Sequence, residues 1–467
     1  MLFNTIEFAI FAIVVFYAYW ALRHRLRWQN AFVVAASYFF YAYWDWRFLS
    51  LLLVTTGATY ASGLLIERAP SKRRAKAVMW ACVALNIGML AFFKYFHFFA
   101  AGAQAIAAGF GYRLDWVTTE ILLPIGISFY TFQAVGYTVD VYKGRTEASH
   151  DPLAFMAFIA FFPQLIAGPI ERASDLLPQF RRERTFRYDE AVLGMRQILW
   201  GLAKKVLVAD GCAFYAGAIY DNPDFYSGSS VVLALFLFIF QLYGDYSGYS
   251  DIAVGLGLLL GIRLTQNFRY PLFARSIPEF WQRWNITLMR WLRDYVYIPL
   301  GGNRKGRLRK WLNILAVFIV SAVWHSAAWG FIVWGVLNAL AFIPSVVTGR
   351  KVPREEASLR NLPRICLVYV LMSLICITYQ FPDIGDCLHF FSCMGLSGGQ
   401  WVLPTGKTPL LFIIPMLIVE WLARRNNFAL ERMPMARGWR WLCYWVILLL
   451  IIYGASYPSQ PYVYFQF

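Results

Sequence analysis

Charged side chains are scarce in this sequence. Asp, Glu, Lys and Arg make up 15% of its 467 residues, whereas 59% are hydrophobic and the mean hydropathy is +0.50. Such a composition excludes a soluble globular domain. Several uncharged runs reach the roughly 20 residues that cross a bilayer as a helix. The sequence therefore predicts an all-α polytopic membrane protein, with about ten to twelve spanning or re-entrant helices in a single domain, residues 1–467.

Cysteine is also sparse, and the seven cysteines are scattered without a C-x-x-C pair. We expect no histidine to act as a partner ligand of a cysteine, so the pattern predicts neither a zinc site nor a redox motif. No metal is expected. Most of these cysteines are expected to be small buried apolar residues. Cys387 and Cys393 are the exception, because they share a predicted exterior loop, residues 381–407, where a disulfide could persist.

Acidic residues are fewer than basic ones, at 26 against 43, which gives a formal net charge of +17. A basic surplus can indicate nucleic-acid binding, but here the basic residues fall in short connections beside apolar runs. That pattern is typical of the positive-inside rule for membrane proteins. We therefore expect membrane lipid around the chain and no nucleic-acid partner.

The distribution of basic residues also predicts the topology. A first span, residues 2–22, stops at a basic cluster, residues 23–27, that is expected to be cytoplasmic, so the N-terminus faces the other side. The opening MLFNTIEF holds an acidic residue and no basic segment, so no cleavable signal peptide is expected. A last span at about 441–455 places the aromatic segment 456–467 outside, as a docking element or an interfacial anchor.

Two apolar regions contain helix-breaking or polar residues. Residues 155–180 carry prolines and a glycine around Gln164, which predicts a broken or re-entrant helix. Residues 231–262 are long enough for one tilted or two short helices. This second region contains Asp245 and Asp251, which we interpret either as a proton relay or as structural hydrogen bonding in a kinked helix. Lys204 and Lys205, in a helical region over 190–220, favour an interfacial or pore-side helix.

The stretch from 278 to 338 changes character halfway along. Its first half is aromatic and basic, whereas residues 312–347 contain no Asp, Glu, Lys or Arg, and His325 lies inside this uncharged run. An ionisable side chain in a membrane-length apolar segment is costly and indicates a functional site. The alternative is a histidine that is hydrogen-bonded between packed helices.

The residue types in this stretch point to acyl transfer. A neutral imidazole, with an ordinary pKa near ~6.5, can take a proton from a hydroxyl at physiological pH. The basic and aromatic segment 281–310 would meet a phosphate-bearing anion from the cytoplasm, since Arg suits phosphate. The alternative for this segment is ordinary positive-inside anchoring. A base and an anion site together suggest transfer from a coenzyme A thioester, although no phosphate-binding glycine motif is present.

Long ordered motifs run through most of the chain from residue 122 onward. They are LLPIGISFYTFQAVGYTVDVYKG (122–144), FFPQLIAGPIERASDLLPQF (161–180), QLYGDYSGYSDIAVGLGLLLGI (241–262), NFRYPLFARSIPEFWQRW (267–284), WLRDYVYIPLGGNRKG (291–306), VWH (323–325) and the terminal YVYFQF. In these motifs the sequence resembles the membrane-bound O-acyltransferase family, and within it the bacterial branch that includes the alginate O-acetyltransferase membrane subunit.

The resemblance implies a helical bundle around a funnel or tunnel, with residues 122–347 as the motif-bearing catalytic core. It implies that His325 is the catalytic histidine and that acetyl-CoA is the donor. It also implies a place in the bacterial inner membrane, where the distribution of basic residues makes both termini periplasmic. The expected partners are periplasmic SGNH-like polysaccharide acetyltransferase subunits and an exported polysaccharide of alginate or cellulose type.

Three positions depart from the family pattern. Asn285 stands where the bacterial branch usually has a second histidine, Ser326 replaces a glycine, and Asn338 stands where another histidine is usual. These departures cast doubt on a two-histidine mechanism. An asparagine can orient a hydroxyl or donate to a developing oxyanion, and we expect Asn285 to act in one of these ways beside the general base His325.

The remaining candidate residues are assigned to binding. Arg293, Arg304 and Lys305 are expected near the phosphates of coenzyme A, with Asp294 fixing Arg293. The other residues that we place along the substrate path, as binding, tunnel-lining or structural groups, are Trp284, Tyr249, Asp245 and Asp251.

Alternative functions stay open at this point. The same chemistry could serve another acceptor, such as peptidoglycan. A transporter or flippase would use the same helices to move a polymer or lipid, with His325 relaying protons. A scaffold subunit would only hold soluble acetyltransferases at the membrane, and His325 would then be dispensable.

Overall fold

The computed structural model describes residues 1–112, 122–166, 168–350, 352–353, 355–395, 398–401 and 410–455. Within these ranges the regular structure is helical, and the strand-like pairing is a single isolated bridge between Tyr226 and Gln400. The predicted all-α class is thus confirmed. The aromatic segment 456–467, predicted to lie outside, falls outside the described residues.

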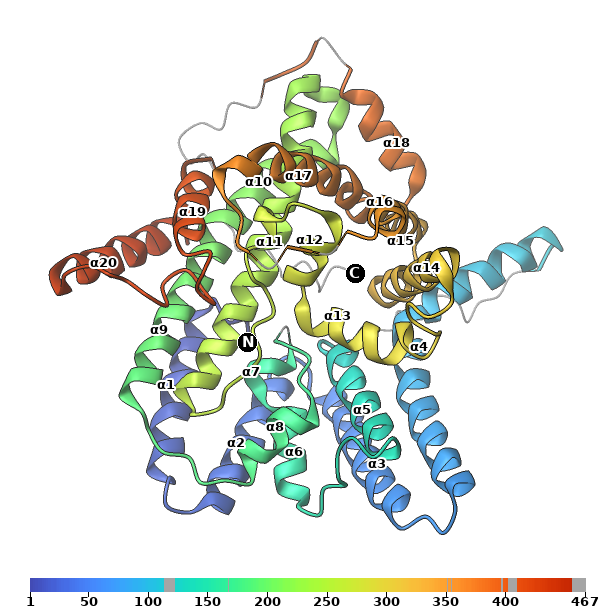
Figure 1. Cartoon of the computed structure of the whole chain (residues 1–467), viewed down its shortest axis with the longest axis vertical. Helices are drawn as coiled ribbons and strands as arrows, with labels where there is room; N and C mark the ends of the chain where they lie inside the picture. Colours follow the sequence, from blue (N-terminus) through green and yellow to red (C-terminus); the bar gives the residue numbers. More distant parts are fainter. Residues whose placement is uncertain are drawn as a thin grey trace. The chain divides into compact units, whose positions relative to one another are not determined.

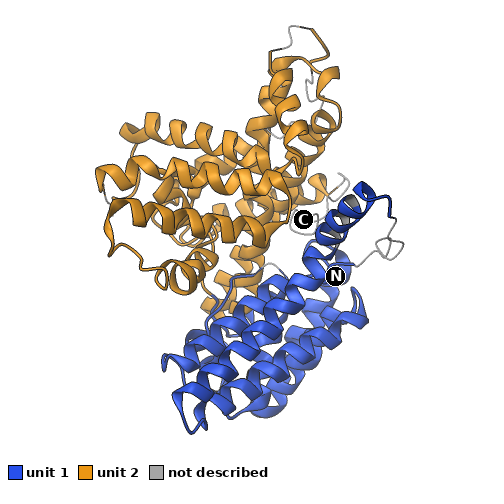
Figure 2. Cartoon of the chain, turned by 90° about the vertical axis from the view of Figure 1, so that its right-hand side faces the viewer, with its two compact units in different colours: residues 1–187, 259–264 blue, residues 188–258, 265–467 orange. Residues whose placement is uncertain are grey.

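The chain forms two compact units, shown in Figure 2. Unit 1 contains residues 1–187 and 259–264, and unit 2 contains residues 188–258 and 265–467. The motif-bearing stretch 122–347 contributes helices to both units. His325 and Asn285 both belong to unit 2.

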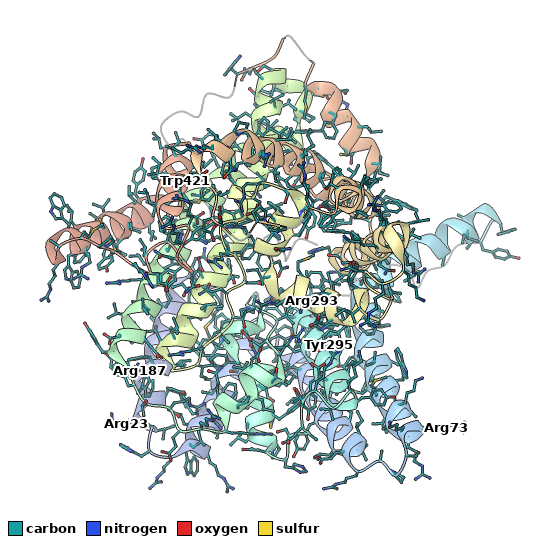
Figure 3. All side chains as sticks on the ribbon, viewed as in Figure 1. Arg23, Arg73, Arg187, Arg293, Tyr295 and Trp421 are labelled. Atoms are coloured by element: carbon teal, nitrogen blue, oxygen red, sulfur yellow. The ribbon has the colours of Figure 1, made fainter. Side chains whose placement is uncertain are left out.

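Unit 1 is built from helices that alternate in direction at its N-terminal end (Figure 1). Thr5 caps the first of them by accepting a hydrogen bond from the backbone N–H of Phe8. The helices are α1 (Ile6–Ala21), α2 (Leu26–Ala42), α3 (Leu49–Glu67), α4 (Lys72–Gly109), α5 (Ile127–Tyr142), α6 (Pro152–Ala160), α7 (Phe162–Leu165) and α8 (Ala173–Phe180). Figure 3 shows Arg23 and Arg73 at the same end of this unit, and the two helices α2 and α3 lie between them in sequence.

The predicted break in residues 155–180 is confirmed. Helix α6 ends at Ala160, and Phe161 leaves the helical conformation with φ −52° and ψ 108°. Pro163 then occupies the first turn of α7, where its missing N–H costs no intrahelical hydrogen bond. Three short helices therefore replace one span.

Unit 2 contains the longer buried helices and both π-helical segments of the described chain. Its elements are α9 (Tyr188–Ala203), the π-helix η3 (Lys204–Ala209), α10 (Asp210–Asp221), η4 (Pro223–Phe225), α11 (Gly228–Leu259), η5 (Pro271–Phe273), α12 (Ile277–Arg283), α13 (Ile286–Leu292), the π-helix η6 (Arg293–Tyr297), α14 (Gly306–His325), α15 (Trp329–Ala341), α16 (Ile343–Thr348), η7 (Leu359–Asn361), α17 (Leu362–Cys376), η8 (Ile377–Tyr379), α18 (Ile384–Cys393), α19 (Leu410–Leu422) and α20 (Arg437–Gly454).

In the described part of the chain, six helical stretches are long and apolar enough to cross a bilayer. They are Trp46–Glu67, Lys72–Phe96, Gly228–Leu259, Gly306–His325, Trp329–Thr348 and Leu359–Tyr379. Shorter apolar helices, such as Ile6–Ala21 and Leu411–Leu422, add to them. The polytopic character predicted from composition is confirmed.

Glycines bring α9 and α11 into backbone contact. A Cβ atom on Gly201 would lie 2.6 Å from the carbonyl oxygen of Gly248, and one on Gly255 would lie 2.6 Å from that of Gly194. Small residues at such crossings let helices approach closely. Helix α11 stays continuous from Gly228 to Leu259, which decides between one long helix and two short ones.

Cys387 and Cys393, between which the sequence left a disulfide open, are both free thiols. They lie six residues apart on α18, inside the segment that the sequence predicted as a loop. Six residues of α-helix rise about 9 Å, beyond the roughly 7 Å over which two Cα atoms can be joined by a disulfide.

Candidate active site

His325 is the last residue of α14 and is 7% exposed. Helix α14 forms an antiparallel hairpin with α15, and the two approach closely because a Cβ atom on Gly335 would lie 2.8 Å from the carbonyl oxygen of Phe318. Ser326 ends α14 with φ −163°, an extended conformation that any residue adopts. The serine therefore replaces the family's usual glycine without backbone strain.

The imidazole of His325 has a defined partner. Its Nδ1 atom lies 2.7 Å from the hydroxyl oxygen of Tyr379, in η8. The rings of Trp324, Phe331 and Trp334 surround it, with centroids 4.6, 6.4 and 5.6 Å away. When Nδ1–H donates to the tyrosine oxygen, Nε2 carries the lone pair that accepts a proton. In this tautomer Nε2 can act as a general base.

A close backbone contact holds Tyr379 in place. The backbone N–H of Gly330, at the start of α15, donates to the carbonyl oxygen of Pro382 over 3.0 Å. A Cβ atom on Gly330 would lie 2.1 Å from the carbonyl oxygen of Phe381. Glycine is therefore needed for the α14–α15 hairpin to lie against the segment that carries Tyr379.

We expect Tyr379→Phe to lower turnover by roughly 10- to 100-fold, the range found when the hydrogen-bond partner that orients a metal-ligating histidine is removed. The ring packing survives the substitution, but Nδ1 loses the oxygen that favours its protonation. Turnover and the melting temperature should be measured together. A Tyr369→Phe variant is the control, because Tyr369 donates to the carbonyl oxygen of Phe236 and does not touch His325. Unchanged turnover in Tyr379→Phe would contradict the orienting role.

Asn285 occupies a backbone position suited to its residue type. It precedes α13 with φ 45° and ψ 53°, in the left-handed region where asparagine is enriched. The side chain is buried, and its Oδ1 atom accepts a hydrogen bond from the Tyr246 hydroxyl over 3.2 Å. Its carboxamide nitrogen is thus the group that can donate to a substrate oxygen.

Trp284 and Asn338 belong to the packing around this site. Trp284 stacks on Phe280, with ring centroids 5.3 Å apart and an interplanar angle of 17°. Asn338 is fully buried, and its Oδ1 atom accepts from the indole N–H of Trp281 over 3.0 Å. Trp281 in turn contacts Trp334, one of the rings around His325. The asparagine at this position therefore joins α15 to α12 by a buried hydrogen bond.

Asp245 and Asp251 take part in a buried ion network with two lysines. Lys205 Nζ lies 2.6 Å from Asp245 Oδ1 and 2.8 Å from Asp210 Oδ1, and Lys204 Nζ lies 2.6 Å from Asp251 Oδ2. Lys205 also lies over the ring of Tyr249, 5.7 Å from its centroid. These contacts support the structural interpretation of the two aspartates and of Tyr249.

Lys204 and Lys205 do not face lipid, as predicted, but they do not lie at an interface either. Their side chains are 3% and 1% exposed, inside unit 2. Lys204 and Lys205 begin the π-helix η3, which continues α9, and they pair with Asp251 and Asp245, which are six residues apart on α11. The glycine-mediated approach of α9 and α11 allows this match.

The proposed anion-binding residues lie at the other end of α14. Arg293 is exposed and pairs with Asp294, with Nε to Oδ1 at 2.7 Å, which agrees with the predicted fixing role of Asp294. Arg304 and Lys305 are exposed and immediately precede α14. Twenty residues of helix separate Lys305 from His325, or about 30 Å. The structure therefore does not bring these cations to the histidine.

Two features of the site were missed by reasoning from sequence. Tyr379 lies in an apolar run that gives no signal of its role, and only the tertiary fold sets it against His325. The ion network was also missed. Lys204 and Lys205 are two charges in an apolar region, and the two aspartates in another apolar region, Asp245 and Asp251, were the signal that could have predicted their pairing.

Comparison with known proteins gives consistent matches. Residues 147–380 match the model of the membrane-bound O-acyltransferase family, MBOAT. A probable alginate O-acetylase AlgI of Azotobacter vinelandii is 36% identical over 379 residues, covering 81% of this chain and 74% of the relative. A second, from Pseudomonas syringae pv. tomato, is 38% identical over 379 residues, covering 81% of this chain and 72% of the relative.

A third relative has another acceptor in its name. The peptidoglycan O-acetyltransferase of Helicobacter pylori is 36% identical over 374 residues, covering 73% of this chain and 69% of the relative. The family match spans His325, Asn285 and Tyr379. With its helical fold and apolar spans, this chain is an O-acyltransferase that belongs to the membrane-bound O-acyltransferase family.

Proposed function

We propose that this chain passes acetyl groups from cytoplasmic acetyl-CoA across the bacterial inner membrane, for O-acetylation of an exported polysaccharide. The observation that carries the proposal is His325, a buried imidazole whose Nδ1 atom lies 2.7 Å from the Tyr379 hydroxyl. Support for acetyl as the group and polysaccharide as the acceptor comes from the relatives named as alginate O-acetylases.

The proposed reaction transfers acetyl from sulfur to oxygen. The acceptor hydroxyl attacks the thioester carbonyl while Nε2 of His325 takes its proton. The tetrahedral intermediate then collapses, the carbon–sulfur bond breaks, and the imidazolium returns the proton to the coenzyme A thiolate. The carboxamide nitrogen of Asn285 would donate to the oxyanion or orient the acceptor.

The placement of the donor follows from charge and length. Arg293, Arg304 and Lys305 would hold the phosphates on the cytoplasmic side, where positive-inside topology puts them. Because Lys305 and His325 lie about 30 Å apart along α14, an extended donor and the long Lys and Arg side chains would have to span this distance together. A compact donor would reach only one of these two groups.

Peptidoglycan is the second candidate acceptor, favoured by the relative from Helicobacter pylori. Both acceptors lie outside the cytoplasm, so both need the same transfer across the membrane. We further propose that a periplasmic SGNH-like acetyltransferase subunit takes the group onward. The identity of that partner would then decide the polymer.

The test uses the purified full-length chain in lipid vesicles with acetyl-labelled coenzyme A outside and a periplasmic acetyltransferase with polysaccharide or peptidoglycan fragments inside. We expect the enclosed acceptor to become labelled by those protein molecules whose basic loops face the outside of the vesicle. Empty vesicles and vesicles without partner are the controls. Thioester that stays intact under every condition would favour the transporter or scaffold interpretation instead.

A further inference from the structure

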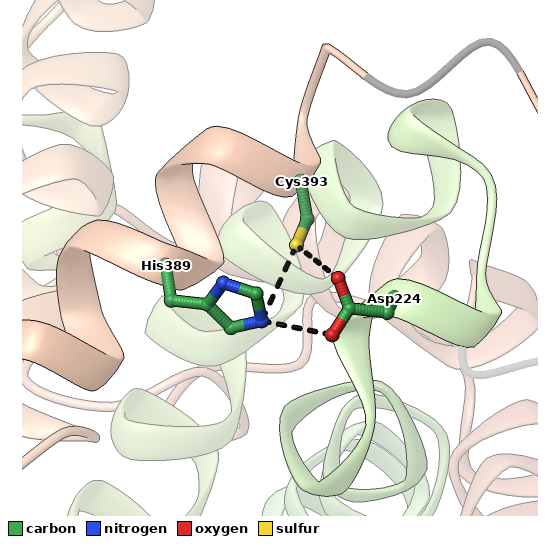
Figure 4. A group of neighbouring side chains, drawn as sticks. All are labelled: Asp224, His389 and Cys393. Atoms are coloured by element: carbon green, nitrogen blue, oxygen red, sulfur yellow. Dashed lines mark hydrogen bonds and ion pairs between the residues drawn. The ribbon is translucent and has the colours of Figure 1, made fainter.

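A second group of reactive side chains lies in unit 2 and contains none of the residues described around His325. Asp224 of η4 and two residues of α18, His389 and Cys393, converge with their ligand atoms within 4.8 Å of one another (Figure 4). His389 Nε2 lies 2.9 Å from Asp224 Oδ2, and Cys393 Sγ lies 3.4 Å from Asp224 Oδ1 and 3.8 Å from His389 Nε2.

The local fold explains why these residues meet. His389 and Cys393 are four residues apart on α18, which puts their side chains on one helix face. The segment around Asp224 is tied to the chain beyond α18 by two backbone hydrogen bonds, from Ser227 N–H to the Gln400 carbonyl and from Gln400 N–H to the Phe225 carbonyl, each 3.0 Å. A residue 165 positions away from His389 thereby completes the group.

The geometry does not fit a catalytic triad. In a triad the histidine contacts the nucleophile through one ring nitrogen and the acidic residue through the other. Here Asp224 and Cys393 both approach Nε2 of His389. All three ligand atoms therefore face one common point, which is how residues surround a metal ion.

We propose that Asp224, His389 and Cys393 form a binding site for a divalent transition-metal ion of the zinc class. Thiolate, imidazole and carboxylate are the ligands that zinc takes, at about 2.3, 2.0–2.1 and 2.0–2.2 Å. In a tetrahedral site those bond lengths put the ligand atoms about 3.3–3.6 Å apart. His389 Nε2 and Cys393 Sγ are 3.8 Å apart, while Asp224 Oδ2 lies 2.9 Å from Nε2 and Asp224 Oδ1 lies 3.4 Å from Sγ. With one carboxylate oxygen as the ligand, the three ligand atoms lie within 4.8 Å of one another, so a rotation of the carboxylate would bring them toward the tetrahedral separations.

The exposure of the three side chains fits a site that a metal ion can enter. Cys393 is 2% exposed, whereas the side chains of His389 and Asp224 are 51% and 63% exposed. The thiol is thus the buried ligand of the proposed site, and the imidazole and the carboxylate are its solvent-exposed ligands. Three protein ligands leave the fourth tetrahedral position to water.

The proposed ion would join two segments that are distant in sequence. It would link η4, between α10 and α11, to α18, which follows the segment that carries Tyr379. Metal binding would therefore stabilise the folded state without touching the acyl-transfer site, by the usual linkage between ligand binding and unfolding. The sequence did not predict this site, because it lacks a C-x-x-C pattern and only two of the three ligands are near each other in sequence.

Cobalt titration of the full-length protein, purified with a histidine-free tag, tests the proposal. We expect one Co²⁺ per chain and a thiolate-to-cobalt charge-transfer band in the near ultraviolet. Cys393→Ser should abolish the band, and His389→Ala and Asp224→Ala should each weaken Co²⁺ binding by at least about tenfold. Zn²⁺ should displace the cobalt and bleach the band.

Two matched controls separate the site from similar surface features. Cys387→Ser removes a thiol from the same helix outside the group, and His150→Ala removes a histidine whose Nε2 atom lies 2.9 Å from Glu67 Oε2 with no thiol beside it. Both should bind Co²⁺ as the wild type does. An equally strong band in Cys393→Ser, or no band in the wild type, would overturn the proposal.

A second measurement uses only the wild-type protein, so it does not depend on whether a variant folds. In the wild type, micromolar Zn²⁺ should protect Cys393 from a thiol-alkylating reagent, while the alkylation of Cys387, on the same helix but outside the group, should not change with Zn²⁺. Peptide mass spectrometry follows both residues in one sample. Equal alkylation of Cys393 in both samples would also overturn the proposal.

Discussion

Replacing His325 with alanine is expected to lower acetyl transfer by about 10²- to 10⁴-fold, the usual contribution of a positioned general base. The acceptor hydroxyl would then have no group at Nε2 to take its proton. The binding residues at the other end of α14 stay in place, so thioester binding should persist. Transfer of labelled acetyl in vesicles measures the first quantity, and retention of labelled acetyl-CoA measures the second.

The variant is expected to fold. His325 ends α14, so its backbone does not interrupt the helix, and its buried side chain is bonded to Tyr379. Loss of this bond removes the imidazole partner of the tyrosine hydroxyl, at a cost of roughly 1–3 kcal/mol. His325→Ala combined with Tyr379→Phe removes both partners and should regain part of that stability without regaining activity.

Three outcomes separate the candidate functions. His150→Ala removes an exposed histidine and should retain full activity. If His325→Ala also retains it, the histidine is dispensable and the scaffold function gains support. If wild-type protein moves polymer or lipid without consuming thioester, the transporter gains support.

Replacing Lys205 with methionine is expected to destabilise the protein by about 3–5 kcal/mol. The substitution keeps the length of the side chain but leaves Asp210 and Asp245 without the cation that lies 2.8 and 2.6 Å away. Both aspartates are buried, so water cannot replace the lost partner at low cost. Thermal unfolding in detergent should show a melting temperature several degrees below that of the wild type.

Matched variants test whether the loss comes from unpaired charge. Lys205→Met combined with Asp245→Leu and Asp210→Asn removes the charges together and should recover much of the stability. Arg47→Met breaks an exposed pair with Asp45 and should leave the melting temperature unchanged. A Lys205→Met protein as stable as the wild type would show that this ion network contributes nothing to the fold.

The order of elements was largely predictable from sequence. Uncharged runs of bilayer length predicted helical spans, and prolines with a glycine around Gln164 predicted the break between α6 and α8. His325 stood out because an ionisable group inside such a run is costly. These predictions depend on local composition and spacing, which the sequence gives directly.

Pairings between distant residues were not predictable in the same way. Cys387 and Cys393 looked like a possible disulfide in a loop, but α18 holds them too far apart. Lys204 and Lys205 looked interfacial, but the crossing of α9 and α11 buries them against Asp251 and Asp245. In both cases the outcome depends on geometry that a single chain segment does not contain.

The sequence by itself determined that this protein is a helical membrane protein and which histidine lies in its apolar interior, because bilayer length and the cost of buried charge act on each segment separately. Only the tertiary structure decided which groups meet: Tyr379 with His325, the lysines with the aspartates, and Asp224 with α18. Each of these contacts joins residues from different helices, and the packing of close-approach glycines such as Gly201 and Gly330 sets their distances.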